Sequence, residues 1–196
     1  MSTALTPREQ QLRGAFRWLN RYMLLHWRLG LGPYANQREL SGQIMVLVHV
    51  GRKTGRTRRT PVNYAIVDGD VYCTAGFGQV ADWYRNLLVN PQVEIWLPHG
   101  WWAGMAEDVS DSPDRLPLLR QVLIASGFAA RVAGLDPAGM TEEALDAASR
   151  PYRLIRIRRT HALTGPGGPG DLAWVWPVAT AVLLGLLLLP RRRRRC

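Results

Sequence analysis

The side chains best suited to chemistry in this sequence are cations gathered in one basic segment, residues 51–61. Five of them fall within eight positions, with glycines and threonines between: Arg52, Lys53, Arg56, Arg58 and Arg59. No carboxylate occurs between Leu40 and Val67, so no neighbour in sequence neutralises them. Guanidinium groups and the backbone N–H groups of a glycine-containing loop suit phosphate or carboxylate oxygens. The segment therefore predicts an anion-binding loop, and the alternative is a solvated basic turn.

Other reactive side chains are too sparse or too scattered for the common classes of site. The chain holds two cysteines, Cys73 and Cys196, which are too few for a disulfide framework or a cysteine-based zinc site. Its four histidines show no spacing typical of metal ligands. We also find no catalytic triad and no pair of carboxylates placed for acid–base work. We therefore expect no metal and a reducing compartment.

The overall charge also favours anionic partners. The chain has 25 basic and 15 acidic side chains and a net charge of +10, and five of the positive charges form the run 191–195. Nucleotide-like cofactors, lipid headgroups and nucleic acid all suit such a balance. The length of 196 residues predicts one domain with appendages, and a hydrophobic fraction of 47% is ordinary for a globular core. The arginines spread through residues 1–30 argue against a signal peptide.

Short strands predict the framework that must position the basic segment. Apolar or alternating runs indicate strands at 44–50, 61–67, 71–75, 93–97, 101–106 and 151–158. The basic segment joins the first two strands, and the Asp-Gly-Asp at 68–70 is a tight hairpin signal. A glycine-rich loop at 76–79 precedes a short helix over 83–88 capped by Asp82, and longer helices are expected at 115–126 and 141–149. The fold class is α+β, a small antiparallel split β-barrel with helical decoration.

The N-terminal segment, residues 1–39, is predicted to be helical outside the barrel. Its apolar residues recur at helical spacing between arginines, which is typical of an amphipathic cationic helix. This helix either packs on its own domain or lies on an anionic membrane surface, with Trp18, Tyr22 and Trp27 at the interface. The barrel domain is expected over 40–160, followed by a proline- and glycine-rich linker over 161–171.

The C-terminal segment, residues 172–196, is predicted to be a hydrophobic transmembrane tail. Residues 172–189 are 18 positions without a charge, which is within the range for a membrane-spanning helix. Pro190 and five arginines follow. With a cytoplasmic barrel, a full span would place these arginines outside, against the positive-inside rule. A shallow tail with its arginines on anionic cytoplasmic headgroups would resolve the conflict, and so would an exported barrel.

Two motifs in the centre of the chain carry a family resemblance. The first is Gly51-Arg52-Lys53-Thr54-Gly55 with Arg58, Thr60 and Pro61 after it, and the second is Trp-Tyr-Arg-Asn-Leu-Leu-Val-Asn-Pro at 83–91, followed by Val93. In this order, with the Asp-Gly-Asp hairpin between them, they resemble the deazaflavin-dependent nitroreductase family. This family is a branch of the split β-barrel flavin-binding folds that binds coenzyme F420. The resemblance covers residues 40–160.

The resemblance implies a cofactor for the basic segment. Coenzyme F420 is a deazaflavin with a phosphate and an oligoglutamate tail, and is therefore polyanionic; FMN is the alternative cofactor. By match to the family motif, Arg52, Lys53 and Arg58 would hold the phosphate and the tail carboxylates. Thr54 and the N–H groups near Gly55 would complete the cradle.

The same match assigns further residues to the deazaflavin ring and its pocket. The cofactor-binding set also includes Thr60, Pro61, Gly76, Phe77, Gly78, Trp83 and Asn86. Backbone at 76–78 would pass close to the ring, where glycine admits near approach. Asn86 would shape the adjacent pocket, and Trp83 would either do the same or anchor its short helix in the core. Arg56 and Arg59 would face solvent or lipid headgroups.

The resemblance implies hydride transfer from reduced F420 to an electron-poor acceptor such as a quinone, enone or nitro compound. Together with the hydrophobic tail, it predicts a lipophilic acceptor and a location at the cytoplasmic side of the cell membrane. The cofactor carries the hydride chemistry, so the protein supplies orientation and a dry pocket. The tyrosines that known family members carry before the last strand are absent here, which leaves Asn63, Tyr64 or solvent as proton donor. A non-catalytic carrier of F420, flavin or tetrapyrrole is the alternative. An arginine-based adaptor for membranes or nucleic acid does not explain the second motif, and no nucleic-acid partner is expected.

Overall fold

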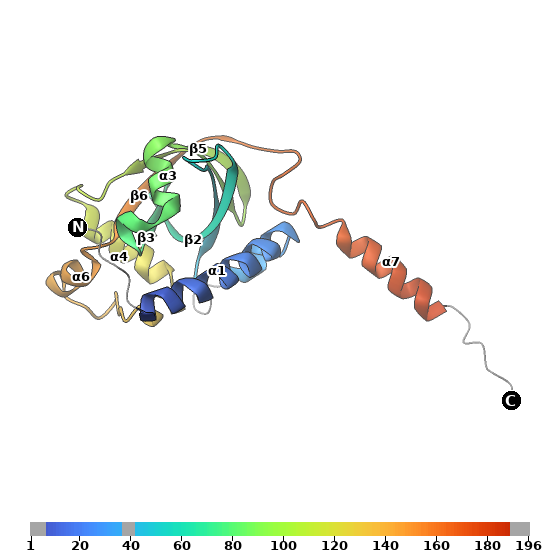
Figure 1. Ribbon diagram of the computed structural model, residues 1–196, viewed down its shortest axis with the longest axis horizontal. Coiled ribbons are helices and arrows are strands. Elements are labelled where there is room, and N and C mark those ends of the chain that lie inside the picture. Colours follow the sequence, from blue (N-terminus) through green and yellow to red (C-terminus); the bar gives the residue numbers. More distant parts are fainter. Residues whose placement is uncertain (1–6, 37–41, 189–196) are drawn as a thin grey trace, which may run out of the picture.

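The computed structural model describes residues 7–36 and 42–188, and the core of this part of the chain is a closed antiparallel β-barrel (Figure 1). The strands are β1 (Ile44–Val50), β2 (Thr57–Val67), β3 (Asp70–Ala75), β4 (Gln92–Leu97), β5 (Gly100–Asp108) and β6 (Arg153–Ala162). They close in the order β1-β2-β3-β6-β5-β4. The predicted α+β split-barrel fold is therefore confirmed, with every predicted strand present among the described residues.

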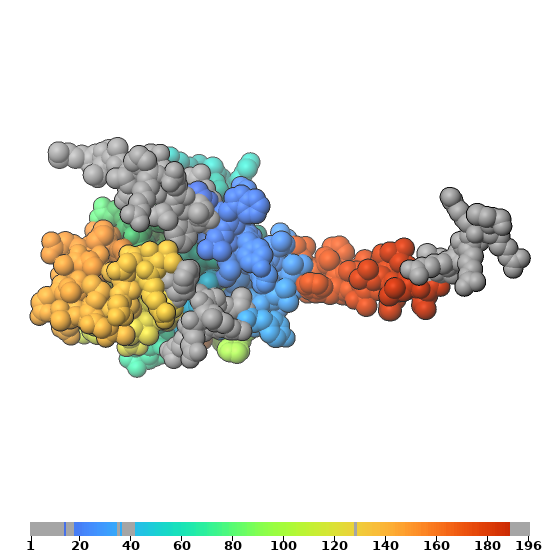
Figure 2. All heavy atoms as spheres, turned by 90° about the horizontal axis from the view of Figure 1, so that it is seen from below, coloured from blue at the N-terminus to red at the C-terminus, as the bar shows by residue number. Residues whose placement is uncertain are grey.

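Helices surround this barrel on several sides (Figure 1). They are α1 (Pro7–Arg28), α2 (Gly32–Ala35), the 3₁₀ turn η1 (Gly78–Val80), α3 (Asp82–Val89), α4 (Arg115–Ala125), α5 (Phe128–Val132), α6 (Glu142–Ser149) and α7 (Val175–Leu188). Helix α1 runs along one side of the barrel, while α4 and α6 cover another flank. Helix α7 projects away from the body of the molecule, as Figure 2 also shows from below.

Alternation along β1 divides the apolar side chains between two cores, because successive residues of a strand face opposite sides. Met45 and Leu47 point into the barrel, where α3 contributes Leu87 to the same cluster. Val46 and Val48 point outward and pack with Trp27 and Trp96 beneath α1. A third cluster, made largely by α4, lies against the outer side of β2 and β3. The barrel interior is thus filled by side chains, and α3 contributes to that filling.

The first structural correction concerns the basic segment, which is only partly a loop. Strand β2 begins at Thr57, four residues before the predicted start at Pro61, and pairs residues 57–60 with the second half of β1. In this register Arg58 lies opposite His49, and Arg59 lies opposite Val48. Antiparallel pairing with β1 holds the Thr-Arg-Arg-Thr run at 57–60 in the ladder, and its two β-branched threonines suit a strand. The basic segment is therefore a β-hairpin whose turn is residues 51–56.

The second correction concerns α1, whose last turns pack on the barrel. Trp27 was expected at a membrane interface, but it is 1% exposed and lies in the cluster beneath the helix. Trp18 and Tyr22 are 76% and 55% exposed and remain free of the core. The two alternatives for this helix thus apply to different parts of its surface: one face is packed, and an aromatic face is open to solvent.

The third correction concerns the C-terminal segment, where the first residues of the predicted helix are not helical. Residues up to 174 are held against α1 instead of being helical: Gly170 N–H donates to the Trp27 carbonyl at 2.9 Å, and Leu172 N–H to the Arg28 carbonyl at 2.8 Å. The helix begins only at Val175. Within residues 7–36 and 42–188, no helix has both the length and the apolar character needed to cross a bilayer. The arginine run 191–195 lies outside the described residues.

Candidate cofactor-binding site

The turn of the basic hairpin closes on itself through its own backbone. Gly51 N–H donates to the Arg56 carbonyl at 2.9 Å, and the N–H groups of Thr54 and Gly55 donate to the Gly51 carbonyl at 3.1 and 2.8 Å. Gly55 has a φ of +65°, a conformation that favours glycine. Because these N–H groups bond within the turn, they do not form the anion cradle expected near Gly55. The groups of this turn that remain available to an anion are therefore its side chains.

Three cations of the hairpin are available to a ligand. Lys53, Arg56 and Arg58 are exposed, and within the described part of the chain no carboxylate forms an ion pair with any of them. Arg58 shares a face of the hairpin with His49, because the two are partners in the ladder. An anion-binding role for Lys53 and Arg58 requires this availability, and the role itself stays a prediction.

Arg59 faces the other way and has a structural role. Its guanidinium lies 5.4 Å from the centroid of the Trp96 ring, a cation–π geometry. Its Nη2 donates to the Gly167 carbonyl at 3.2 Å, which ties the C-terminal connection to the barrel. The prediction that Arg59 faces solvent or lipid is therefore wrong: alternation along β2 directs it into the packing beneath α1.

Arg52 joins the hairpin to α3. Its Nη1 donates to Asn86 Oδ1 at 2.9 Å, and its Nη2 forms an ion pair with Asp82 Oδ1 at 3.0 Å. Its backbone N–H donates to the same Asn86 oxygen at 3.1 Å. The Arg52 side chain is 19% exposed and that of Asp82 is 83% exposed, so the carboxylate remains open to displacement. Asp82 makes this ion pair rather than the predicted helix cap. Arg52 is thus a fixed cation at the edge of the turn.

A buried histidine extends this connection into the barrel, and the sequence reasoning missed it. His49 is 3% exposed, with its Nδ1 3.2 Å from Asn86 Nδ2 and its Nε2 3.1 Å from Thr60 Oγ1. Burial, assisted by the nearby Arg58 charge, lowers the pKa of His49 to about 4. The ring is therefore neutral near pH 7. A histidine two residues before a glycine-rich basic turn is the only sequence signal, and it becomes informative once the hairpin register is known.

The remaining candidate cofactor-binding residues on β2 and α3 do not all face the same side of the barrel. Thr60 bonds to His49, whereas Pro61 lies opposite Val46 on the outer face of the hairpin. Trp83 packs against the barrel core, which matches its interpretation as an anchor of α3.

In the glycine-rich loop after β3, the backbone conformation and a close contact require glycine at position 78. At Gly78, φ is +57° and an added Cβ would lie 2.2 Å from the Pro151 carbonyl oxygen. Gly76 faces open space, and Phe77 is 38% exposed. The close approach that Gly78 permits is thus to the Pro151 backbone, whereas a Cβ added at Gly76 would meet no atom within 4 Å.

The two proton-donor candidates lie further along β2. Tyr64 is four residues beyond Thr60, about 13 Å at roughly 3.3 Å per residue. Its side chain is 4% exposed within the barrel core, and burial raises its pKa to about 12. Asn63 faces outward and its amide donates to the Gln43 carbonyl at 3.3 Å. The structure does not bring either residue to the basic turn.

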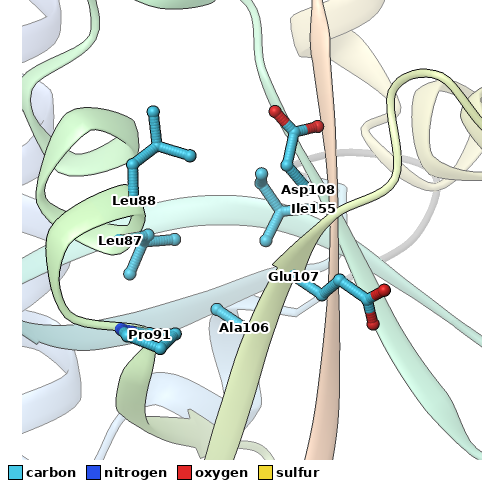
Figure 3. A pocket seen from close by; sticks show the side chains of 7 residues that line it. All are labelled: Leu87, Leu88, Pro91, Ala106, Glu107, Asp108 and Ile155. Atoms are coloured by element: carbon cyan, nitrogen blue, oxygen red, sulfur yellow. The ribbon is translucent and has the colours of Figure 1, made fainter.

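A small cavity of about 190 Å³ lies between α3 and β5 (Figure 3). Its lining residues are Leu87, Leu88, Pro91, Ala106, Glu107, Asp108 and Ile155. Leu88 is two residues beyond Asn86, roughly 200° around the helix, so the cavity is on the side of α3 away from the turn. Its polar groups are carboxylates, and Glu107 already pairs with Arg156 at 2.7 Å. The cavity is therefore unsuited to an anionic cofactor.

Comparison with known proteins gives this geometry a family. Similar solved structures include a conserved hypothetical protein from Mycobacterium tuberculosis, at 21% identity, with 62% of this chain and 76% of that chain covered and a TM-score of 0.46. They also include an F420 reductase (19% identity, 65% and 94% covered, TM-score 0.43) and the F420-H2 dependent reductase FDR-A (15%, 62% and 99%, 0.43). The model of the F420H(2)-dependent quinone reductase family matches residues 32–136, which is more than half of the chain and spans both sequence motifs. The chain therefore belongs to the F420H(2)-dependent quinone reductase family, and is an F420-dependent reductase.

Proposed function

We propose that this reductase uses the basic hairpin turn to hold the anionic end of F420 and reduces a lipophilic quinone at a membrane surface. The observation that carries the proposal is the group of three exposed, unpaired cations beside one fixed arginine. A phosphate followed by glutamate carboxylates requires several cations along a path rather than a single strong site. Lys53, Arg56 and Arg58 fit that requirement.

The protein's own contribution is to bind, orient and exclude water. Arg52, held by Asn86 and Asp82, would present an oriented guanidinium, and the ligand's oxygens would compete with the exposed Asp82 carboxylate. Gly76 leaves open backbone for the ring. When bound, reduced F420 supplies the hydride, so no nucleophile of the protein is needed. Tyr64 keeps its proton because of its raised pKa, which supports solvent as the proton source.

A membrane location is supported by the exposed apolar surface of α7. Helix α7 has no buried residue among its 14, and Leu183 and Leu187 are 60% and 80% exposed. At a rise of about 1.5 Å per residue it is roughly 21 Å long, enough to enter one leaflet. The five arginines that follow in the sequence suit anionic headgroups on the cytoplasmic side. Lipid-soluble quinones are found in that layer.

The proposal is tested by following the oxidation of reduced F420 by a lipophilic quinone dissolved in anionic vesicles. We expect turnover and vesicle binding with the wild-type protein. A Leu183→Asp/Leu187→Asp variant should lose vesicle binding, and with it turnover of the lipophilic quinone, but keep turnover of a short-chain, water-soluble one. Equal activity of this variant on both quinones would overturn the membrane location.

A second candidate is a carrier that binds F420 without turning it over. The observation that favours it is that neither proton-donor candidate lies at the basic turn: Tyr64 is buried in the barrel core, and the Asn63 amide donates to the Gln43 carbonyl. Tight F420 binding with no oxidation by any quinone of a graded series would establish the carrier and overturn the quinone assignment.

A further inference from the structure

A continuous chain of polar contacts runs from β2 through His49 to the basic turn. Thr60 Oγ1 contacts His49 Nε2 at 3.1 Å, His49 Nδ1 contacts Asn86 Nδ2 at 3.2 Å, and Asn86 Oδ1 accepts from Arg52. We infer that His49 is a positioning residue for cofactor binding: it orients the Asn86 amide so that its oxygen holds Arg52 and the turn in a binding-ready shape. The expected effect of His49 on F420 affinity rests on the proposed function, whereas its expected effect on the shape of the turn does not.

The contacts to Arg52 favour one arrangement of this chain, in which the His49 ring also has a hydrogen bond to the Val50 backbone. Arg52 offers only donors, its backbone N–H and its Nη1, so the Asn86 oxygen must face it. The Asn86 amide nitrogen, which can only donate, therefore faces His49 Nδ1, and that nitrogen must carry a lone pair. The ring proton then resides on Nε2 and is donated to Thr60 Oγ1. Each link determines the next, so the tautomer of His49 is coupled to the position of Arg52.

Burial makes this arrangement costly to disturb. His49 and Asn86 are 3% and 5% exposed, so water cannot readily replace a lost contact. If the acceptor at Nδ1 is removed, the buried NH₂ group of Asn86 loses its partner, and only the two donors of Arg52 still favour the native orientation of the amide. A rotated amide would present its NH₂ group to two donors of Arg52, and the turn would keep only the contacts of Arg52 to Asp82 as its link to α3. Cofactor binding would then include the cost of reordering the turn.

Two replacements of His49 separate positioning from simple packing. The amide oxygen of asparagine coincides in place with Nδ1, so His49→Asn keeps an acceptor for Asn86. Glutamine places its amide near Nε2, so His49→Gln keeps the contact to Thr60 and loses the one to Asn86. Both variants remove the ring and its packing. A role in packing alone predicts equal effects, whereas the positioning role predicts unequal ones.

The first measurement is the exchange rate of the Arg52 backbone amide in the protein without cofactor. We expect His49→Asn to retain protection and His49→Gln to exchange at least about tenfold faster, since a buried amide left unsatisfied loses about that factor. The second measurement is the dissociation constant of F420 by fluorescence. We expect His49→Asn to retain affinity and His49→Gln to lose it. Equal exchange and equal affinity in the two variants overturn the inference, whether both match the wild type or both fall.

A third variant keeps the test decisive if either histidine replacement fails to fold. Asn86→Ser removes the oxygen that holds Arg52 and should raise both amide exchange and the F420 dissociation constant. Unchanged exchange at Arg52 in this variant overturns the inference. If the wild-type protein shows a protected Arg52 amide that depends on His49 but no affinity for F420, the proposed function fails while the positioning of the turn stands.

Discussion

Lowering the pH from 7 to 4 should destabilise the protein through His49 in particular. The pKa of this buried ring is lowered from 6.5 to about 4, mainly by desolvation and further by Arg58. As the pH falls below 6.5, the unfolded chain takes up a proton at this histidine and the folded chain does not. The free energy of unfolding therefore decreases with falling pH between about 6.5 and 4, and the contribution is fully present above 6.5.

The size of the effect follows from the pKa difference. A shift from 6.5 to about 4 corresponds to about 3 kcal/mol at pH 4, since each pKa unit is worth about 1.36 kcal/mol. This is a large share of the roughly 5–15 kcal/mol that stabilise a typical domain. Protonation would also place an N–H group of His49 against the donor side of the Asn86 amide, so the same transition opposes the contact to α3.

The assay is urea unfolding at a series of pH values for the wild-type protein and for His49→Asn, which cannot titrate at this position. Carboxylates lose their own contributions in both proteins, so the difference between the two curves isolates His49. We expect this difference to be constant above pH 7 and to change by about 3 kcal/mol by pH 4. Parallel curves over the whole range would refute the neutral, buried state of the ring.

Two further predictions concern other parts of the framework. Gly78→Ala should lower the free energy of unfolding by ~3 kcal/mol, because the new Cβ would lie 2.2 Å from the Pro151 carbonyl in a left-handed backbone conformation. Gly55→Ala has the same strain in open space and should lose only ~1 kcal/mol, so equal losses in thermal melts would contradict the role of the Pro151 contact. Removing the Arg28–Asp171 ion pair with Asp171→Asn should cost under ~1 kcal/mol but accelerate proteolysis in residues 164–174, while Arg158→Ala at the ion pair to Glu107 should leave that cleavage unchanged. Unaltered cleavage in Asp171→Asn would show that the backbone contacts alone hold this connection.

The barrel could be predicted from the sequence because its signals are local. Apolar runs such as 44–50, the Asp-Gly hairpin and the proline after α3 each determine an element within a few residues. The pairing of 57–60 with β1 could not be predicted in the same way, because these polar and charged residues lack the apolar pattern of a strand. Their register is set by the partner strand β1. That register decides that Arg58 faces the turn and Arg59 faces Trp96.

The candidate site was predicted by residue type but not by role. The motif identified Arg52 and Asn86, and the structure joins them to each other rather than leaving both free for a ligand. His49 has no motif of its own, and its importance depends on contacts with residues 11 and 37 positions away in sequence. In the C-terminal segment, an uncharged stretch predicted a helix from residue 172. Backbone contacts with α1 hold the chain before Val175, so the helix begins later.

The dissociation constant of F420 tests the central claim most directly. We predict that Lys53→Ala and Arg58→Ala each raise it at least about tenfold, in line with ~1.5–3 kcal/mol for a charge-assisted hydrogen bond, and that added salt weakens wild-type binding. Arg150→Ala, which removes the same charge from an exposed position after α6, should change it less than about twofold. Melting temperatures should remain unchanged in all three variants, because these side chains are exposed. Wild-type affinity in Lys53→Ala and Arg58→Ala, or an equal loss in Arg150→Ala, would contradict the assignment of the basic turn as the cofactor's anion site.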